Sequence, residues 1–176
     1  MRVLRISLQF TAFMMLFIFV ACASTKFSAV WKDETYQGRP EKVLVINAFP
    51  SPATRRLFEE EFVKALKDRR IDAVVSYTAM PDPIVSDMNA IAAQANAVGA
   101  DTVLINKPLG TTQGETSGAG GITYKDVYVN TQTDVYDMKS KKLIMSATAE
   151  TWIFQGDPYP AQIRSYVKAL VNKLSR

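Results

Sequence analysis

The run Lys42–Phe49 (KVLVINAF) constrains the fold of this chain more than any other segment. It is apolar without alternation and rich in β-branched residues, which is typical of a strand buried on both faces. Both faces of such a strand have to be shielded from water by other parts of the domain. Ser51 and Pro52 follow, and they suit the N-cap and first position of a helix that runs to about Arg70.

Strands and helices continue to alternate along the chain. Ile71–Tyr77 predicts a second strand, a helix capped near Ser86 ends at Gly99, and Asp101–Asn106 predicts a third strand. Strands that are joined by helices through short links pair in parallel, with right-handed crossovers. This segment therefore predicts a parallel βαβαβ core.

The rest of the chain follows a different pattern. Tyr124–Tyr136 and Lys142–Phe154 predict two strands, joined by the hairpin loop Asp137–Lys141. Pro160–Leu174 predicts a closing helix. The predicted fold class is α/β: a single-domain mixed-sheet sandwich in the order β-α-β-α-β-β-β-α. It has a parallel βαβαβ core, an antiparallel hairpin and a C-terminal helix.

The charged residues of the first helix lie at helical spacing. Arg56 and Glu60, and Glu60 and Lys64, are four residues apart, so oppositely charged side chains lie side by side on the helix. This pattern favours a solvated helix face over a ligand site.

The N-terminal segment has the composition of an export signal. Arg2 and Arg5 precede an apolar stretch that is densest at Phe10–Val20, and small residues follow at positions 21–24. This order is typical of a secretory signal. The apolar stretch is short for a membrane-spanning helix, which needs about 20 apolar residues.

The tetrapeptide Phe19-Val20-Ala21-Cys22 resembles the lipobox of bacterial lipoproteins, with Phe19 where Leu is usual. The resemblance implies that the chain is cleaved between Ala21 and Cys22, and that the Cys22 thiol and the new amine are acylated. Two or more acyl chains hold a protein stably at a membrane, at about 0.8 kcal/mol per buried methylene. The alternatives are an uncleaved membrane anchor and an ordinary secretory signal with an incidental cysteine.

The lipobox divides the chain into a signal peptide (1–21), a lipid-anchored arm (22–40) and a globular domain (41–176). We expect Phe27, Val30 and Trp31 to pin the arm onto the domain, because they are too apolar for a free linker. Ala23 after the cysteine implies, by the same resemblance, transport to the outer membrane and a position facing the periplasm.

Two absences exclude much chemistry. The chain has no histidine, and Cys22 is its only cysteine. A His-dependent triad, a His-ligated metal site and an intramolecular disulfide are therefore impossible. We expect no metal, and no cofactor apart from the covalent lipid on Cys22. The formal charge of +4 falls to about +2 without Arg2 and Arg5, which is too balanced for nucleic-acid binding.

The segment Gly110–Gly121 (GTTQGETSGAGG) is the strongest local anomaly. Glycine-rich backbone holds phosphate where a strand leads into a helix, but this segment leads from strand to strand and lacks Gly-Lys-Ser/Thr. We therefore expect a flexible loop, which is able to order on a partner. Its glycines are Gly110, Gly114, Gly118, Gly120 and Gly121, five of the eight in the chain.

One face of the strand 124–136, with its neighbour on the hairpin, is the candidate interaction surface. Aromatic rings beside polar groups suit recognition. Counting from Tyr136 opposite Lys142 places Tyr128 opposite Glu150 and Asp126 opposite Trp152. The alternative is an exposed sheet face stabilised by cross-strand pairs. The candidate residues are Tyr124, Asp126, Tyr128, Asn130, Gln132, Tyr136, Glu150 and Trp152, with Asp134 on the same face.

Residues 40–175 resemble a group of envelope lipoproteins built on one small α/β unit. The resemblance rests on Lys42–Ile46 leading into a helix, on Ala100–Ile105, and on the hairpin strands at 135–137 and 142–144. The group includes the outer-membrane activators of peptidoglycan synthases, the N-terminal domain of the Tol-Pal propeller protein and the curli-secretion lipoprotein. The resemblance implies a non-enzymatic envelope module that binds another envelope protein or assembles with copies of itself.

A second function from a different class stays open. The same anchored domain would bind a small molecule or a glycan, or act as an enzyme that uses the carboxylates of Asp126, Asp134 or Glu150.

Overall fold

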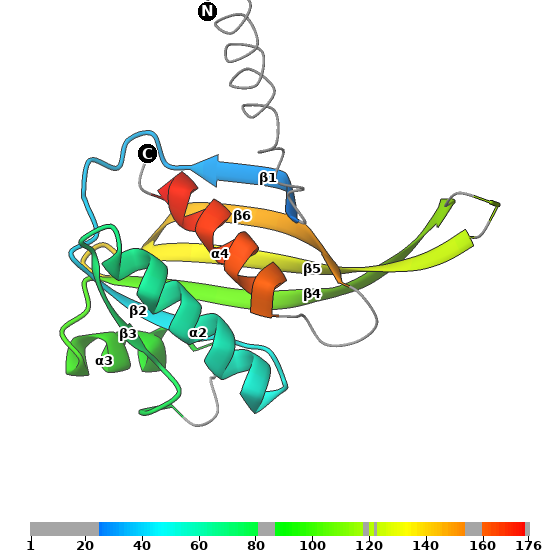
Figure 1. The fold of residues 1–176 in the computed structure, drawn as a ribbon. Helices are drawn as coiled ribbons and strands as arrows, with labels where there is room; N and C mark the ends of the chain where they lie inside the picture. The colour runs from blue at the N-terminus through cyan, green and yellow to red at the C-terminus, as the bar shows by residue number, and fades with distance from the viewer. Residues whose placement is uncertain (1–24, 81–86, 118–119, 122, 154–159, 175–176) are drawn as a thin grey trace, which may run out of the picture.

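The structure is a computed structural model that describes residues 25–80, 87–117, 120–121, 123–153 and 160–174. This part of the chain forms one sheet with helices on both of its faces (Figure 1). The described strands lie in the order β1-β6-β5-β4-β2-β3. The elements are β1 (Thr25–Lys32), β2 (Lys42–Asn47), α2 (Pro52–Lys67), β3 (Asp72–Val75), α3 (Met88–Ala97), β4 (Thr102–Ser117), β5 (Thr123–Asp137), β6 (Lys142–Ile153) and α4 (Pro160–Leu174).

The predicted mixed α/β class and its parallel core are confirmed. β2 pairs in parallel with β3 on one side and with β4 on the other. Right-handed crossovers that run in opposite directions along a sheet place their helices on opposite faces. The core agrees with this rule, because Val43 and Val45 pack with the α2 residues, and Leu44 and Ile46 pack with the α3 residues. The fully apolar strand is therefore buried on both faces.

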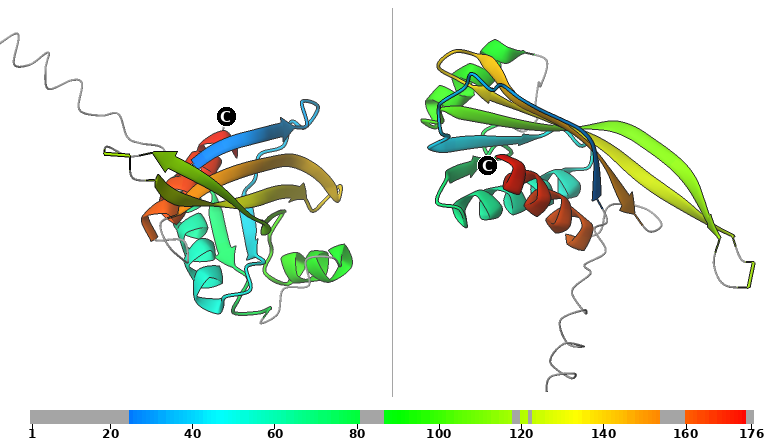
Figure 2. Two further views of the ribbon diagram at one scale, coloured as in Figure 1. Left: turned by 90° about the vertical axis from the view of Figure 1, so that its right-hand side faces the viewer. Right: turned by 90° about the horizontal axis from the view of Figure 1, so that it is seen from above.

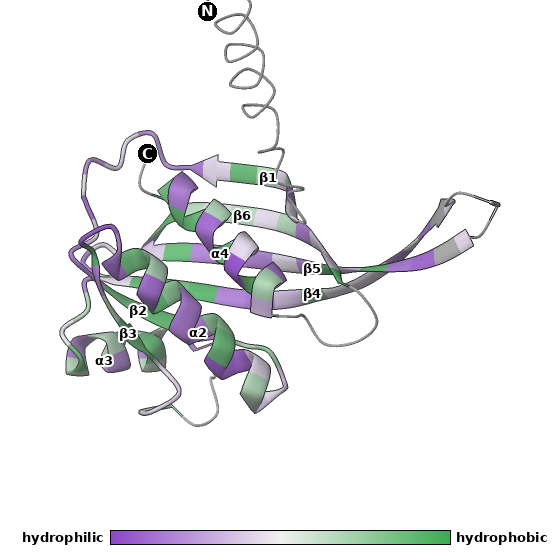
Figure 3. Cartoon of the chain, viewed as in Figure 1, coloured by the Kyte–Doolittle hydropathy of each residue, from purple (hydrophilic) through white to green (hydrophobic). Residues whose placement is uncertain are grey.

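Helix α4 lies beside α2 on one face of the sheet (Figures 1 and 2). Tyr166 of α4 is 1% exposed, and its ring meets Phe58 and Phe62 edge-on. A buried aromatic side chain removes about 150–250 Å² from water, so Tyr166 anchors this core. Hydrophobic and hydrophilic residues alternate along both helices, as expected of helices with one buried side (Figure 3).

The predicted helix boundaries are largely reproduced. The Ser51 hydroxyl accepts a hydrogen bond from the Thr54 N–H at 3.3 Å, which confirms the N-cap of α2. The N-cap of α3 is Asp87, whereas the predicted cap, Ser86, lies outside the described residues. Gly99 follows α3 with a φ of 68°, the conformation that ends a helix at glycine.

The segment predicted as an arm contributes the first strand. β1 pairs antiparallel with β6 and so extends the sheet at its edge. Phe27 packs into the core, with its ring stacked 6.3 Å from that of Tyr166. Val30 and Trp31 lie in the part of β1 that pairs with β6, so the arm is attached there through the backbone, but their side chains stay 41% and 49% exposed.

The flexible loop predicted at the glycine-rich segment is wrong for Gly110 and Gly114. Both lie in β4, which pairs with β5 as far as Ser117 opposite Thr123. A β-bulge at Leu109 and a φ of 125° at Gly110 adjust the backbone at the start of this extension. The glycine content indicates bends in the strand and not the end of it.

Two of the other predicted loop glycines, Gly120 and Gly121, lie between the described parts of β4 and β5. Gly120 and Gly121 have positive φ values of 82° and 75°, which suits a turn, and Gly118 lies outside the described residues. Two views show β4 and β5 projecting together beyond the rest of the sheet (Figures 1 and 2).

Candidate functional site: the open face of the sheet

The open face is the side of β1, β6, β5 and the outer part of β4 that faces away from α2 and α4. On this side α3 packs over β2 and the first residues of β4, and the described helices leave the remainder uncovered (Figure 2). Even-numbered residues of β5 and β6 share this face, since Tyr128 pairs with Trp152 and Asn130 with Glu150. An antiparallel sheet commonly has one such solvated face.

The predicted pairing of Tyr128 with Glu150, and of Asp126 with Trp152, is wrong by two residues. Tyr136 lies opposite Leu143 instead of Lys142, and the register shifts once more between Val135 and Tyr136. Counting along the sequence does not detect such an irregularity. Because two residues are one full period of a strand, the predicted residues still share a face.

Asp134 is the centre of the polar contacts on the open face, and it is 4% exposed. Its carboxylate accepts hydrogen bonds from Ser146 Oγ at 2.7 Å and from Gln132 Nε2 at 2.9 and 3.0 Å. Lys107 Nζ lies 3.3 Å from its second oxygen. These partners come from β4, β5 and β6, so Asp134 ties three strands together.

The aromatic residues lie toward the outer end of the open face. Trp152 Nε1 donates to Asp126 Oδ1 at 2.8 Å. A Cβ placed on Gly114 would lie 3.1 Å from the ring of Tyr128, so this ring covers the glycine. Rings that are held by their neighbours supply rigid contact area at a low cost in conformational entropy.

Not every predicted residue belongs to the open face. Tyr136 packs against the cluster under α3, where burial and the negative charge of Asp134 raise the pKa of its phenol. The side chain of Tyr124 lies outside the described residues. Asn130 Nδ2 donates to Thr112 Oγ1 at 3.3 Å. The predicted residues that share the open face are Asp126, Tyr128, Asn130, Gln132, Glu150 and Trp152.

The three carboxylates considered for catalysis are far apart. Asp126 and Asp134 are separated by eight residues of β5, or about 26 Å at the usual rise of a strand. Glu150 pairs with Asn130, midway between them. Paired catalytic carboxylates of glycosidases lie within about 10 Å of each other. Among the described residues no group of three His, Cys, Asp or Glu side chains is placed to hold a metal ion.

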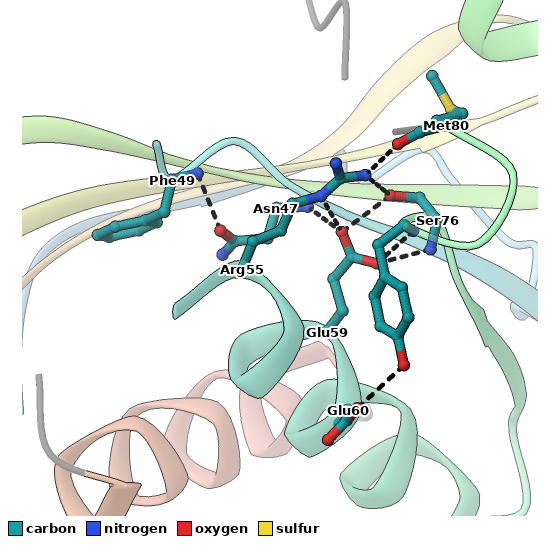
Figure 4. A network of polar contacts seen from close by, with 8 residues as sticks. Asn47, Phe49, Arg55, Glu59, Glu60, Ser76 and Met80 are labelled. Atoms are coloured by element: carbon teal, nitrogen blue, oxygen red, sulfur yellow. Dashed lines mark hydrogen bonds and ion pairs between the residues drawn. The ribbon is translucent and has the colours of Figure 1, made fainter. Parts of the chain in front are cut away.

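The most deeply buried ion pair lies under α2. Glu59 is 0% exposed, and its Oε1 lies 3.0 Å from Arg55 Nε (Figure 4). Its carboxylate also accepts from the backbone N–H groups of Asn47, Ser76 and Tyr77, and from the Ser76 hydroxyl. The pair therefore joins α2 to the carboxyl ends of β2 and β3.

Sequence reasoning missed this pair. Of the charged pairs expected on α2, Arg56 instead lies 5.1 Å from the centre of the Tyr77 ring, and the Tyr77 hydroxyl donates to Glu60 at 2.9 Å. A signal was present, because Arg55 and Glu59 are spaced four apart on the same helical side as the apolar Phe58 and Phe62.

No protein-family model and no curated protein sequence matches the chain. Its structure is similar to the PelC dodecamer from Paraburkholderia phytofirmans, with a TM-score of 0.55 and 15% identity over 85% of this chain and 96% of that one. A single-substitution variant of the PelC dodecamer from the same organism gives a TM-score of 0.52 at 14% identity, over 85% and 96%. The lipoprotein GNA1162 from Neisseria meningitidis gives 0.49 at 15% identity, over 77% and 99%.

At these identities the likeness shows the fold alone. The chain has the fold of PelC, and bacterial lipoproteins are among its structural neighbours. The described helices include none that is long and apolar enough to cross a membrane.

Proposed function

We propose that this chain is a non-catalytic lipoprotein of the bacterial cell envelope, held at the outer membrane by a lipid on Cys22 and facing the periplasm. Its domain assembles with other protein chains, copies of itself first. The observation that carries the proposal is the open face, on which aromatic and amide side chains are fixed by their neighbours and no described helix covers them (Figure 2). Fixed aromatic and polar groups of this kind are typical of protein–protein contact surfaces.

The short stretch of chain between Cys22 and β1 implies that the domain lies close to its lipid anchor. Cys22 precedes the first residue of β1, Thr25, by three positions, so at most about 11 Å of extended chain separates the lipid from the sheet. The domain is then held against the membrane surface by the starting end of β1, and not at the end of a long tether.

Two further observations favour assembly over catalysis. The carboxylates of the open face are far apart, and Asp134 already has hydrogen-bonding partners on three strands. PelC, which has the same fold, is described as a dodecamer.

The anchor is tested by the variant Cys22→Ala. We expect the variant to lose the mass of the acyl chains and to leave the membrane fraction or to remain unprocessed, because acylation needs the thiol. Ser24→Ala, two residues further on, is the matched control and should keep both properties. Unchanged mass and membrane fractionation of Cys22→Ala would refute the anchor.

Assembly is tested by sedimentation of the full lipoprotein in mild detergent over a range of concentrations. We expect a species that contains several copies and that dissociates on dilution, as mass action requires. A protein that stays monomeric at every concentration would rule out self-assembly.

A further inference from the structure

Two long strand edges have no neighbour among the described residues. β1 ends the strand order, and the outer edge of β4 is unpaired beyond Asn106, where its pairing with β2 stops. The free edge of β4 includes Gly110–Ser117, which matches the length of β1 (8 residues). The edge of β3, at the other end of the strand order, spans only 4 residues. The unpaired N–H and C=O groups of a strand edge form a template for another strand.

The large hydrophobic side chains that the described residues expose lie on these same two edges. Val30 and Trp31 near the end of β1 are 41% and 49% exposed, and Leu109 at the start of the free β4 edge is 52% exposed. Single exposed hydrophobic residues are ordinary on a protein surface. Their restriction to the two long unpaired edges is typical of a surface that another chain covers.

We propose that β1 of one copy adds antiparallel to the free edge of β4 in a second copy. This inference rests on the self-assembly proposed above, and it places the contact between copies at two strand edges that border the open face. Within one copy β1 is antiparallel to β6, β6 to β5, and β5 to β4, so β1 and β4 run in opposite directions. Repeating one copy-to-copy step therefore extends a continuous antiparallel sheet. Such head-to-tail contacts form rings or filaments.

Antiparallel addition brings the exposed hydrophobic residues together. Trp31 lies near the end of β1 and Leu109 at the start of the free β4 edge, so opposite directions bring the two side by side. Parallel addition would instead place Trp31 toward Ser117. The antiparallel register that sets Trp31 opposite Gly110 also keeps the faces matched, because both residues belong to the open face.

Gly110 leaves room for the ring in that register. A Cβ placed on this glycine would have nothing within 4 Å, in contrast to Gly114, which the ring of Tyr128 covers. An aromatic side chain over a strand glycine is a recognised way of stabilising a sheet. In the same register Val30 lies opposite Thr111, and both face the side of α2 and α4.

Disulfide cross-linking in membranes tests the register with the full lipoprotein. In the double variant Val30→Cys/Thr111→Cys each copy carries both halves of the interface, so oxidation should give a ladder of dimers, trimers and larger species. A disulfide needs Cα atoms within about 7 Å. The matched control Val30→Cys/Ser117→Cys moves one thiol about 20 Å along β4 and should give no ladder. Equal ladders from both pairs, or none from the first, would overturn the interface.

Single variants separate this arrangement from a two-fold one. Val30→Cys alone and Thr111→Cys alone should stay uncross-linked, whereas a mixture of the two should yield dimers. Dimers from Val30→Cys alone would show that β1 pairs with β1, which is a different interface and overturns the proposal.

Sedimentation distinguishes failure of this interface from failure of assembly itself. A monomeric wild type ends both proposals, whereas an assembled wild type without a cross-linked ladder ends this one alone. We expect Trp31→Ser to weaken assembly about tenfold or more, since a buried Trp commonly dominates an interface. Its circular dichroism should stay unchanged, because Trp31 is exposed in one copy. Lys168→Ala, an exposed change on α4, should leave assembly unaltered.

Discussion

Glu59 and Asp134 are both buried carboxylates, but they contact different halves of the sheet and have different partners. Glu59 of α2 contacts the parallel half, and the side chain of its partner Arg55 is 6% exposed. Asp134 belongs to the antiparallel half, and the side chain of its partner Lys107 is 38% exposed. A fully buried pair is costly to break, whereas a pair with one partner in water contributes little. The parallel half is therefore fixed by a pair that is buried on both sides, whereas the buried Asp134 of the open face is paired with a lysine that reaches solvent.

Loss of Glu59 is expected to give the largest effect. Glu59→Ala removes the carboxylate that balances the buried charge of Arg55, so the free energy of unfolding should fall by about 3–5 kcal/mol, as measured by urea unfolding. The neighbouring exposed change Glu60→Ala should cost less than about 1 kcal/mol. The double variant Arg55→Met/Glu59→Leu should recover only the part of the loss that comes from the unbalanced charge, because leucine accepts no hydrogen bond from the backbone N–H groups of Asn47 and Tyr77. Equal stabilities of Glu59→Ala and Glu60→Ala would contradict the role of the buried pair.

The second-largest effect is a pH dependence of the free energy of unfolding, caused by Tyr166. Burial raises the pKa of Tyr166 to about 12 from its ordinary value of 10.0. Because the pKa is higher in the folded state, the stabilisation is complete below about pH 10 and is lost as the pH rises toward 12. The difference corresponds to about 3 kcal/mol.

This dependence is measured by comparing the free energy of unfolding at about pH 8 and at about pH 11, where about half of the 3 kcal/mol should be lost. Tyr166→Phe should be less stable at the lower pH, because the hydroxyl of Tyr166 contacts Asn106 and Thr133, and it should lose much of the decline at the higher pH. Tyr77→Phe, on the exterior, should keep the decline. An identical decline in wild type and Tyr166→Phe would assign it to other groups.

The smallest effect is expected on the open face. Asp134→Asn keeps the shape of the side chain but removes the ion pair with the half-exposed Lys107, so it should cost about 1 kcal/mol in urea unfolding. Glu150→Gln on the same face is the control, with an expected change below about 0.5 kcal/mol. A loss for Asp134→Asn as large as that for Glu59→Ala would remove the contrast between the two halves.

The parts of the fold that were predictable from sequence are those with a local signal. In each of these parts, a few neighbouring residues are enough to predict the local structure. They are the continuous apolar strand Lys42–Asn47, the helix cap at Ser51 and the turn Asp137–Lys141. The outer part of β4 was missed because glycine-rich sequence has low strand propensity, and pairing with β5 decides its conformation. The sequence predicted that the segment around Phe27 contacts the domain but did not predict a strand of the sheet. Its pairing partner β6 lies more than a hundred residues away in the chain, so no local signal identifies the pairing.

The candidate site was predictable as a face but not as a set of contacts. Alternation along β5 identifies which side chains share a side, and this survives an error of two residues in register. The contacts depend on partners from other strands, as Lys107 and Ser146 show at Asp134. Burial of Tyr136 under α3 likewise depends on a helix far away in the chain.

The buried pair under α2 also limits how this protein diverges over time. A descendant that replaces Arg55 or Glu59 alone passes through a form with an unbalanced interior charge, so accepted replacements have to arrive together or follow a compensating change. Distant relatives should therefore have both residues or neither, whereas the residue at position 107 should vary more readily, because Lys107 is partly exposed. An arginine and a glutamate at these two positions would indicate common descent between chains whose overall sequence identity is too low to show it.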